Sequence, residues 1–210
     1  MCGKPLIAYS IELAIKLKED GIVSRVVVST DSDKYAVIAR QFGAEVPFLR
    51  PKNISTDTSK SAELIAHALD FFEEKDILFD SVILLQPTSP IRKKKQLEKA
   101  IKMFERKNAD SLISCYEEGY VNDLVMYRKN KSGYLFPLNP LHNAGIRKQN
   151  HKKVFIRNGN LYITETSYFK KTGRIISDRP LLFRMSKIES ANVDSVEDLE
   201  LVRLILCKSA

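Results

Sequence analysis

Apolar and polar residues follow two different periods along this chain, and each period predicts a different kind of element. Between Leu6 and Leu17 the apolar residues recur every three or four positions, which predicts a helix that stops at Asp20-Gly21. The β-branched run at 23–29 predicts a buried strand instead. The same reasoning predicts further helices at 33–42, 58–74, 93–107 and 196–206, and further strands at 45–49, 81–86, 110–116, 160–164 and 181–186.

This order of elements predicts an α/β fold in a single domain, residues 1–210. Strands that alternate with helices favour a mostly parallel sheet with helices on both faces. The pattern breaks at 118–152, where a polar stretch with three glycines and two prolines predicts an excursion from the core. The first helix follows a short turn directly, so the opening strand that such sheets usually carry is missing from this sequence.

Composition narrows the class of protein. Hydrophobic residues make up 44% and charged residues 29%, which is ordinary for a globular protein. The net charge of +8 comes from scattered lysines without interleaved aromatic residues, so we expect no nucleic-acid partner. The lysines indicate a solvated surface or electrostatic attraction of an anionic small molecule. No stretch predicts a membrane span or a signal peptide, so we expect no membrane partner.

The three cysteines are Cys2, Cys115 and Cys207, and no two form a CxxC pair. Their wide spacing predicts neither a disulfide scaffold nor a zinc site. Cys115 falls in an apolar strand, which predicts a packed core thiol. We therefore expect a cytoplasmic protein.

The segment from Leu84 to Arg92 carries the clearest sign of a binding site. An apolar strand stops abruptly at a polar loop with two prolines, as a buried strand does when its carboxyl end carries a ligand. Gln86 can donate and accept hydrogen bonds, Thr88 and Ser89 add hydroxyls, and the prolines stiffen the backbone. Arg92 offers a planar donor fork for an anion.

Several segments together resemble the acylneuraminate cytidylyltransferases, also called CMP-sialic acid synthetases. They occur in the order of that family and span essentially the whole chain, and the Gln-Pro-Thr-Ser-Pro-x-Arg loop is the most specific of them. The segments are Gly3-Lys4-Pro5-Leu6, Val27-Val28-Ser29-Thr30-Asp31, Arg50-Pro51 with Thr56-Asp57-Thr58, Leu84 to Arg92, Asn158-Gly159-Asn160-Leu161-Tyr162-Ile163, and Asn192-Val193-Asp194 through Glu197-Asp198-Leu199.

The resemblance implies a three-layer Rossmann-like nucleotide-diphospho-sugar transferase fold. It implies that CMP passes from CTP to the anomeric hydroxyl of a nine-carbon α-keto acid sugar, with release of pyrophosphate and with Mg2+ as cofactor. It also implies a homodimer in which the stretch 118–152 is an extended dimerisation arm. The alternative for this stretch is a long surface loop, although its leucines and phenylalanine would be awkward on a monomer.

On the nucleotide side, the resemblance matches Arg50 and Ser61 to positions near the cytidine nucleotide. The alternatives are an exposed arginine before Pro51 and an ordinary serine at a helix start. Gln86, Pro87, Thr88 and Ser89 match the loop between cytidine and sugar, of which Gln86 is a catalytic candidate. The alternative for this loop is a tight turn.

Three further residues match the catalytic and metal positions of the family. Arg92 matches a position that faces the substrate, or else it caps a surface helix. Asp194 matches the second of two aspartates that hold Mg2+, or else it caps the following helix. Asn192 stands at the first aspartate position, and its amide oxygen can bind Mg2+ but carries no charge.

On the sugar side, Lys148 and Gln149 stand where the family commonly has Arg-Gln, and Lys148 loses the bidentate fork for a carboxylate. A family arginine aligns with Ile156. Whether the neighbouring Arg157 replaces it stays open, because adjacent residues of a strand face opposite ways. Asn158 and Tyr162 are retained. The particular sugar therefore stays open among sialic, legionaminic, pseudaminic and related acids.

The resemblance also implies an opening strand and a glycine- and lysine-bearing phosphate loop before Gly3-Lys4, and neither is in this sequence. We therefore expect inefficient catalysis from the chain as written, through either a misassigned start or a fragment. Two alternatives stay open. One is a non-catalytic relative that binds nucleotide or sugar without turnover, and the other is a Kdo-type cytidylyltransferase.

Overall fold

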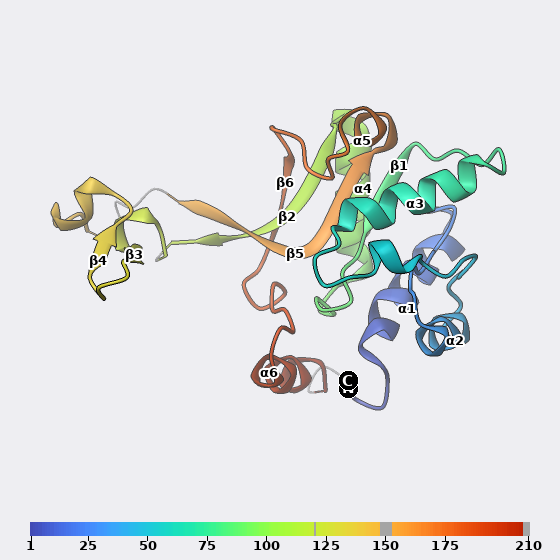
Figure 1. The fold of residues 1–210 in the computed structure, drawn as a ribbon, viewed down its shortest axis with the longest axis horizontal. Helices are drawn as coiled ribbons and strands as arrows, with labels where there is room; N and C mark the ends of the chain where they lie inside the picture. The colour runs from blue at the N-terminus through green and yellow to red at the C-terminus, as the bar shows by residue number, and fades with distance from the viewer. Residues whose placement is uncertain (120, 148–152, 208–210) are drawn as a thin grey trace.

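The computed structural model describes residues 1–119, 121–147 and 153–207 (Figure 1). Its main sheet has four strands in the order β1-β5-β2-β6, with β1 at Ser81–Leu84, β2 at Ser111–Glu118, β5 at Val154–Glu165 and β6 at Leu181–Met185. Strands β1, β2 and β6 point the same way, whereas β5 is antiparallel to both of its neighbours. The sheet is therefore mixed, because β5 returns directly alongside β2 after the excursion.

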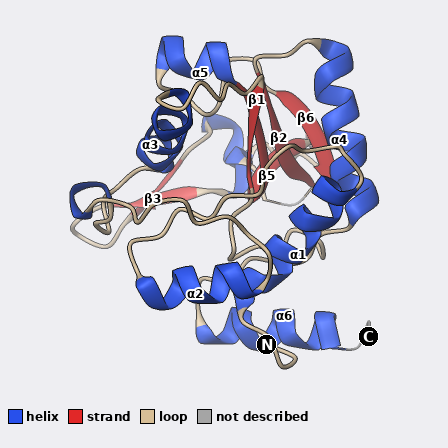
Figure 2. Cartoon of the chain, turned by 90° about the vertical axis from the view of Figure 1, so that its right-hand side faces the viewer, coloured by secondary structure: helices blue, strands red, loops and turns tan. Residues whose placement is uncertain are grey.

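Helices cover both faces of this sheet, as predicted (Figure 2). Alternate residues of the β1 segment separate the two sides: Ile83 and Leu85 pack on the core formed with α4 (Lys94–Lys107), and Val82 and Leu84 pack on the core formed with α3 (Ser61–Glu73). Strand residues alternate in direction, so one strand contributes to two hydrophobic layers. The result is a three-layer arrangement of helix, sheet and helix.

The predicted helices are confirmed with small shifts at their ends. They are α1 at Leu6–Glu19, α2 at Asp33–Gln41, α3, α4 and α6 at Val196–Cys207. The structure adds one short helix that the sequence reading missed, α5 at Thr166–Thr172, which ends at Gly173 with a φ of 65°. Glycine reaches this left-handed conformation without a steric penalty, so it stops the helix.

The predicted strands at 23–29 and 45–49 are wrong as regular strands. The two segments meet in a single parallel bridge between Val27 and Glu45. The Val28 N–H donates to the Glu45 carbonyl at 2.9 Å, and the Glu45 N–H donates to the Val26 carbonyl at 2.8 Å. The β-branched run has the composition of a strand, but among the described residues it finds only this one short partner, and a ladder needs continued pairing.

Strand β5 is much longer than the predicted 160–164, and it contains a large bulge. Ile113 of β2 faces Tyr162, yet Cys115 two residues later faces Arg157, so the residues between 157 and 162 lie opposite Ser114 alone. Gly159 has a φ of 71° within this bulge. Bulges of this kind change the direction of a strand and commonly occur beside functional sites.

Beyond the sheet, β2 and β5 lead into a projecting arm at the left of Figure 1. The arm contains an antiparallel pair, β3 at Tyr127–Lys129 and β4 at Leu135–Pro137, with short 3-10 turns at Asp123–Val125 and Pro140–Asn143. All six residues of the two strands are exposed. The excursion that the sequence pattern indicates therefore stands away from the core as a small hairpin unit.

The cysteine prediction is wrong in one respect, because Cys2 and Cys207 form a disulfide with a Cα–Cα distance of 6.0 Å. They are 205 residues apart in sequence, and the end of α6 brings Cys207 beside the N-terminal turn (Figure 1). Cys115 is a buried free thiol, as predicted, and burial raises its pKa. Among the described residues, no helix is both long enough and apolar enough to cross a membrane.

Candidate functional site

The polar loop after β1 is a tight turn whose second half is buried. The Ser89 N–H donates to the Gln86 carbonyl at 3.1 Å, which closes the turn. Pro87 stays exposed, whereas Ser89 is fully buried and Pro90 is buried after it. The loop follows the carboxyl end of β1, where the sequence predicts a binding site.

The half-buried Arg92 connects this loop to two other elements of the fold. Its Nη2 donates to the Gln86 carbonyl at 2.7 Å, its Nη1 donates to Ser10 Oγ at 2.8 Å, and its Nε donates to the carbonyl and Oδ1 of Asn160 at 2.8 and 2.9 Å. Burial lowers the pKa of Arg92 to about 9. The alternative that Arg92 caps a surface helix is therefore wrong, because oxygens of α1, of β5 and of the loop hold its guanidinium. That Arg92 faces the substrate stays a prediction.

Asn160 and Ser10 are the residues that the sequence reading missed. The buried Asn160 side chain accepts from Arg92 and donates from Nδ2 to the carbonyls of Ile91 and Glu189, at 3.2 and 3.1 Å. The Asn-Gly-Asn segment was visible in the sequence, and the second asparagine could have been singled out as a buried polar residue that needs partners. Nothing in the local pattern of α1 marks Ser10.

The bulge of β5 brings Gly159 against the side chain of Gln86. A Cβ atom at Gly159 would lie 2.5 Å from Gln86 Oε1, so only glycine allows this approach. The Ser114 hydroxyl provides hydrogen bonds to polar groups of the bulge: it accepts from the Leu161 N–H at 2.8 Å and donates to Asn158 Oδ1 at 2.6 Å. The position of the Gln86 amide therefore depends on β5 as well as on its own loop.

The segment 192–194 lies against the same loop, although more than a hundred residues separate the two in sequence. Ser89 Oγ donates to Asn192 Oδ1 at 3.0 Å, and the Val193 N–H donates to the Thr88 carbonyl at 2.8 Å. The structure thus brings together the predicted loop and the predicted metal residues. No local sequence pattern could establish this contact.

Asp194 does not cap helix α6, so the structural alternative for this residue is wrong. Ser195 and Asp198 cap the helix reciprocally: Asp198 Oδ2 accepts from the Ser195 N–H at 2.9 Å, and Ser195 Oγ accepts from the Asp198 N–H at 3.1 Å. The Asp194 N–H, the Ser195 hydroxyl and the Ser195 N–H all donate to the Asp198 carboxylate and lower its pKa. The exposed Asp194 carboxylate has no hydrogen-bond or ion-pair partner among the described residues.

Asn192 and Asp194 offer two oxygen ligands of the kind that Mg2+ prefers. Within residues 1–119, 121–147 and 153–207, no group of three or more His, Cys, Asp and Glu side chains could hold a metal ion. Mg2+ commonly keeps waters and phosphate oxygens and takes only one or two ligands from the protein. The free carboxylate of Asp194 beside the amide of Asn192 fits such a partial site.

Arg50 and Ser61 lie on other elements. Arg50 Nε donates to Ser55 Oγ at 2.9 Å, and its Nη2 lies 3.6 Å from Asp31 Oδ1. Ser61 is the first residue of α3, whose start is closed by the Lys60 N–H donating to Glu63 Oε2 at 2.8 Å. Among the described residues, no hydrogen bond or ion pair joins Arg50 or Ser61 to the Gln86 loop.

The predicted sugar residues on β5 divide into buried and exposed groups. Asn158 is enclosed, because its Nδ2 also donates to Ser190 Oγ at 2.8 Å. Tyr162 is buried, and burial raises its pKa. Arg157 is exposed and pairs with Cys115, whereas Ile156 pairs with Tyr116, so the two successive side chains face opposite ways. Lys148 and Gln149 lie outside the described residues.

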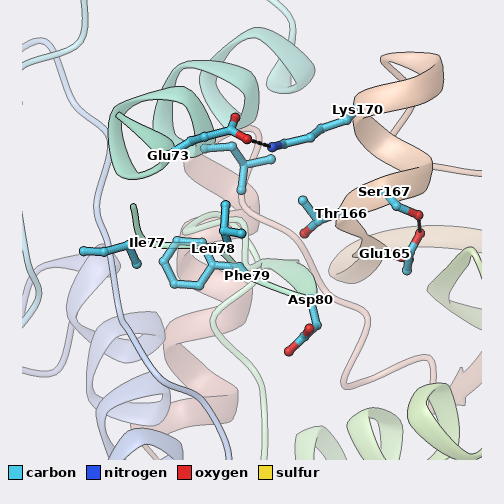
Figure 3. A pocket seen from close by; sticks show the side chains of 10 residues that line it. Glu73, Ile77, Leu78, Phe79, Asp80, Glu165, Thr166, Ser167 and Lys170 are labelled. Carbon is cyan, nitrogen blue, oxygen red and sulfur yellow. Dashed lines mark hydrogen bonds and ion pairs between the residues drawn. The ribbon is translucent and has the colours of Figure 1, made fainter. Parts of the chain in front are cut away.

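A separate pocket of about 360 Å³ lies at the other end of β1 (Figure 3). Asp80, which precedes β1, and Glu165, which ends β5, line it together with the ion pair between Glu73 and Lys170, whose Oε1 and Nζ are 2.6 Å apart. The Gln86 loop follows the opposite end of the same strand. The pocket therefore contributes nothing to the candidate site.

Comparisons of the sequence point to one family. The sequence model described as cytidylyltransferase matches residues 1–208. The pseudaminic acid cytidylyltransferase of Campylobacter jejuni subsp. jejuni serotype O:2 is 27% identical over 203 residues, which cover 97% of this chain and 85% of that protein. The N-acylneuraminate cytidylyltransferase of Escherichia coli O18:K1:H7 is 30% identical over 209 residues, which cover 96% of this chain and 46% of that protein.

The fold comparison agrees with the sequence comparison. A solved structure of CMP:2-keto-3-deoxy-manno-octonic acid synthetase complexed with CTP superposes with a TM-score of 0.67, covering 99% of this chain and 90% of that chain. A 4-diphosphocytidyl-2C-methyl-D-erythritol synthase superposes with a TM-score of 0.64, covering 97% and 90%. Their sequence identities of 15% and 13% relate the folds alone.

Proposed function

Because the chain belongs to the cytidylyltransferase family, we propose that it transfers CMP from CTP to the anomeric hydroxyl of a nonulosonic acid and releases pyrophosphate. Relatives that cover nearly all of this chain are named for pseudaminic acid and for N-acylneuraminate, which are sugars of this class. In the reaction, the anomeric oxygen forms a bond to the α-phosphorus, the bond from that phosphorus to the bridging oxygen breaks, and the hydroxyl proton leaves to solvent.

One observation carries the proposal: the Gln86 loop and the segment 192–194 are hydrogen-bonded at the carboxyl end of β1. This juxtaposition places an amide, the hydroxyl of Thr88 and the free carboxylate of Asp194 around one edge of the sheet. Ligands of open α/β sheets bind outside the carboxyl ends of the strands. A nucleotide and a sugar acid need such polar groups on a rigid support.

The loop residues act in this scheme by holding the two substrates in contact. Gln86 donates from its amide to a substrate oxygen, and Gly159 leaves room for its side chain at the β5 bulge. Pro87, Thr88 and Ser89 shape the loop between nucleotide and sugar. Such positioning is the main contribution that a protein makes to phosphoryl transfer.

The remaining predicted residues divide between the two substrates. Arg50 and Ser61 contact the nucleotide, and Arg157 is the exposed cation on β5 for the sugar carboxylate. Asn158 and Tyr162 support that surface from the protein interior. Lys148 and Gln149 complete the sugar side.

Asp194 and Asn192 would hold Mg2+, with the carboxylate as the charged ligand and the amide as the neutral one. When bound there, Mg2+ neutralises phosphate charge. The chain's own contribution is the hydrogen bond from Ser89 Oγ, which orients the amide oxygen of Asn192, and the bond from the Val193 N–H to the Thr88 carbonyl, which holds the backbone beside Asp194.

The arm formed by residues 118–152 supports a homodimer in this proposal. It exposes a cluster of large apolar side chains on a small hairpin unit, and apolar patches of this kind mark interaction surfaces. The most exposed members are Tyr134, Leu135, Phe136 and Leu141, at 71, 62, 55 and 58%. A second copy of the chain is the partner that we propose for them.

We place the reaction in the cytoplasm, where nucleotide triphosphates are made. The disulfide between Cys2 and Cys207 is unusual for that compartment. In a reducing cytosol the pair would exchange with small-molecule thiols.

The direct test mixes the chain with CTP, Mg2+ and one sugar acid at a time, and measures pyrophosphate release. The panel contains pseudaminic, legionaminic and N-acetylneuraminic acids and Kdo. We expect release that requires all three components and that is fastest with a nine-carbon acid. Equal release without sugar contradicts the transfer reaction, Kdo as the best substrate favours the Kdo-type alternative, and binding of CTP without any release favours the non-catalytic alternative.

A further inference from the structure

The guanidinium of Arg92 joins three elements that are far apart in sequence. It donates to Ser10 of α1, to the Gln86 carbonyl of the loop and to two oxygens of Asn160 in the β5 bulge. The corresponding sequence separations are 82, 6 and 68 residues. The planar fork of arginine matches this divergent set of acceptors, which the point charge of a lysine cannot do.

All four acceptors are neutral oxygens. Among the described residues, no carboxylate lies within ion-pair distance of Arg92. Burial is the cause of its lowered pKa of about 9, and at that value the group still carries its charge at neutral pH. A half-buried cation without a neighbouring anion is costly for a folded protein, so its retention needs an explanation.

The hydrogen bonds of Arg92 also reach the candidate site. The Gln86 carbonyl receives Nη2 of Arg92 directly and also the N–H of Ser89. The peptide that carries the Gln86 side chain is therefore fixed from both directions. The charge lies one hydrogen bond behind a loop that we assign to a nucleotide.

We propose that Arg92 is a positioning residue whose half-buried, unpaired charge and four hydrogen bonds hold the Gln86–Ser89 loop and attract the phosphates of CTP to it. This inference deepens the proposed function and rests on it. The missing anion is supplied by the nucleotide, so the charge is compensated only when the substrate is bound. A guanidinium that acts through the loop needs no contact with the substrate.

The first test neutralises the charge and leaves Arg92 in place. Ser10→Asp puts a carboxylate beside Nη1, and Ser10→Asn is the matched neutral variant of equal size. The probes are CTP, which is anionic, and cytidine, which is neutral, with Kd measured by calorimetry. We expect Ser10→Asp to bind CTP about tenfold more weakly than Ser10→Asn does, with equal Kd for cytidine. Equal CTP affinities in the two variants would overturn the electrostatic role.

The second test separates geometry from charge at Arg92 itself. Arg92→Lys keeps the charge and loses the fork, so we expect KM for CTP within about threefold and kcat at least about tenfold lower. Arg92→Gln loses the charge, and we expect weaker CTP binding with little change for cytidine. Unchanged kcat in Arg92→Lys contradicts the positioning role, and equal losses for CTP and cytidine in Arg92→Gln indicate a purely structural role.

A control and a check on folding complete the design. Arg106→Gln removes an exposed arginine from the far end of α4, and we expect no change in either Kd. Thermal unfolding identifies any variant that fails to fold, and because the Ser10 pair and the Arg92 pair are independent, either pair decides the question. If the wild-type chain binds no CTP, the proposed function fails, and inorganic pyrophosphate then serves as the anionic probe for the same comparisons.

Discussion

The Gln86 loop and the projecting arm are built on opposite principles. The loop is short and polar, and it is hydrogen-bonded to the segment before α6 and to Arg92, which in turn donates to α1 and to the β5 bulge. The arm is longer and exposes apolar side chains such as Leu135 and Phe136. The loop finds its contacts within one chain, whereas we propose that the arm packs against a partner.

The bulge in β5 lies between the Gln86 loop and the arm. One end of β5 lies in the sheet, and the other end pairs with β2 on the way to the arm. Gly159 stands between the two parts and approaches Gln86. A change in the loop should therefore affect catalysis and leave assembly intact, and a change in the arm should do the reverse.

The largest effect is expected at Gln86. Gln86→Ala should lower kcat/KM by about 100- to 1,000-fold, because it removes a prepositioned hydrogen-bond donor from the site. The melting temperature should stay unchanged, since the loop is held through its backbone carbonyl. Steady-state pyrophosphate release and a thermal melt measure both, with exposed Gln41→Ala on α2 as control. Wild-type kinetics in Gln86→Ala would remove this residue from the site.

A substitution in the arm should weaken dimer formation. Phe136→Asp places a charge in the exposed apolar cluster, so we expect the dimer Kd to rise about 10- to 100-fold. The melting temperature of the dissociated chain should change little. Sedimentation at several concentrations measures the dimer, and Leu78→Asp, at a residue 73% exposed on the body, is the control. A monomeric wild type would contradict the proposed role of the arm.

Two glycines allow the regions to be compared with the same substitution. Gly159 and Gly133 have φ values of 71° and 89°, so alanine should cost about 1–3 kcal/mol of backbone strain at either position. Gly159→Ala also meets Gln86 Oε1, whereas nothing lies within 4 Å of a Cβ at Gly133. We expect a roughly tenfold loss of kcat in Gly159→Ala alone. Equal kcat values in the two variants would mean that the Gly159 contact does not position Gln86.

The smallest effect is expected at the metal residues. Asn192→Asp adds a charged ligand and keeps an oxygen that accepts from Ser89 Oγ. The Mg2+ concentration for half-maximal activity should fall about fivefold, the factor that corresponds to roughly 1 kcal/mol between charges near the surface. A magnesium titration of pyrophosphate release provides the measurement. An unchanged midpoint would separate Asn192 from the metal.

Local pattern was sufficient for the five longer helices and for the binding loop, although it missed the short α5. The apolar period of Leu6 to Leu17 defined α1 within a residue or two, because one helix face must be buried whatever lies against it. The loop after β1 was located from an apolar strand that meets two prolines. Local pattern could not show whether the segments at 23–29 and 45–49 form regular strands, because a ladder requires a partner strand that composition does not identify.

The sequence by itself determined the α/β class, the place of the Gln86 loop and the family to which the chain belongs. Only the tertiary structure decided that Arg92 is held inside by Ser10 and Asn160, that Asp194 is free while Ser195 caps α6, and that Cys2 meets Cys207. Helix periods and turns arise from neighbours in sequence, so the residues encode them directly. Contacts between residues 82 or 205 positions apart depend on how the whole chain packs, and no short segment contains that information.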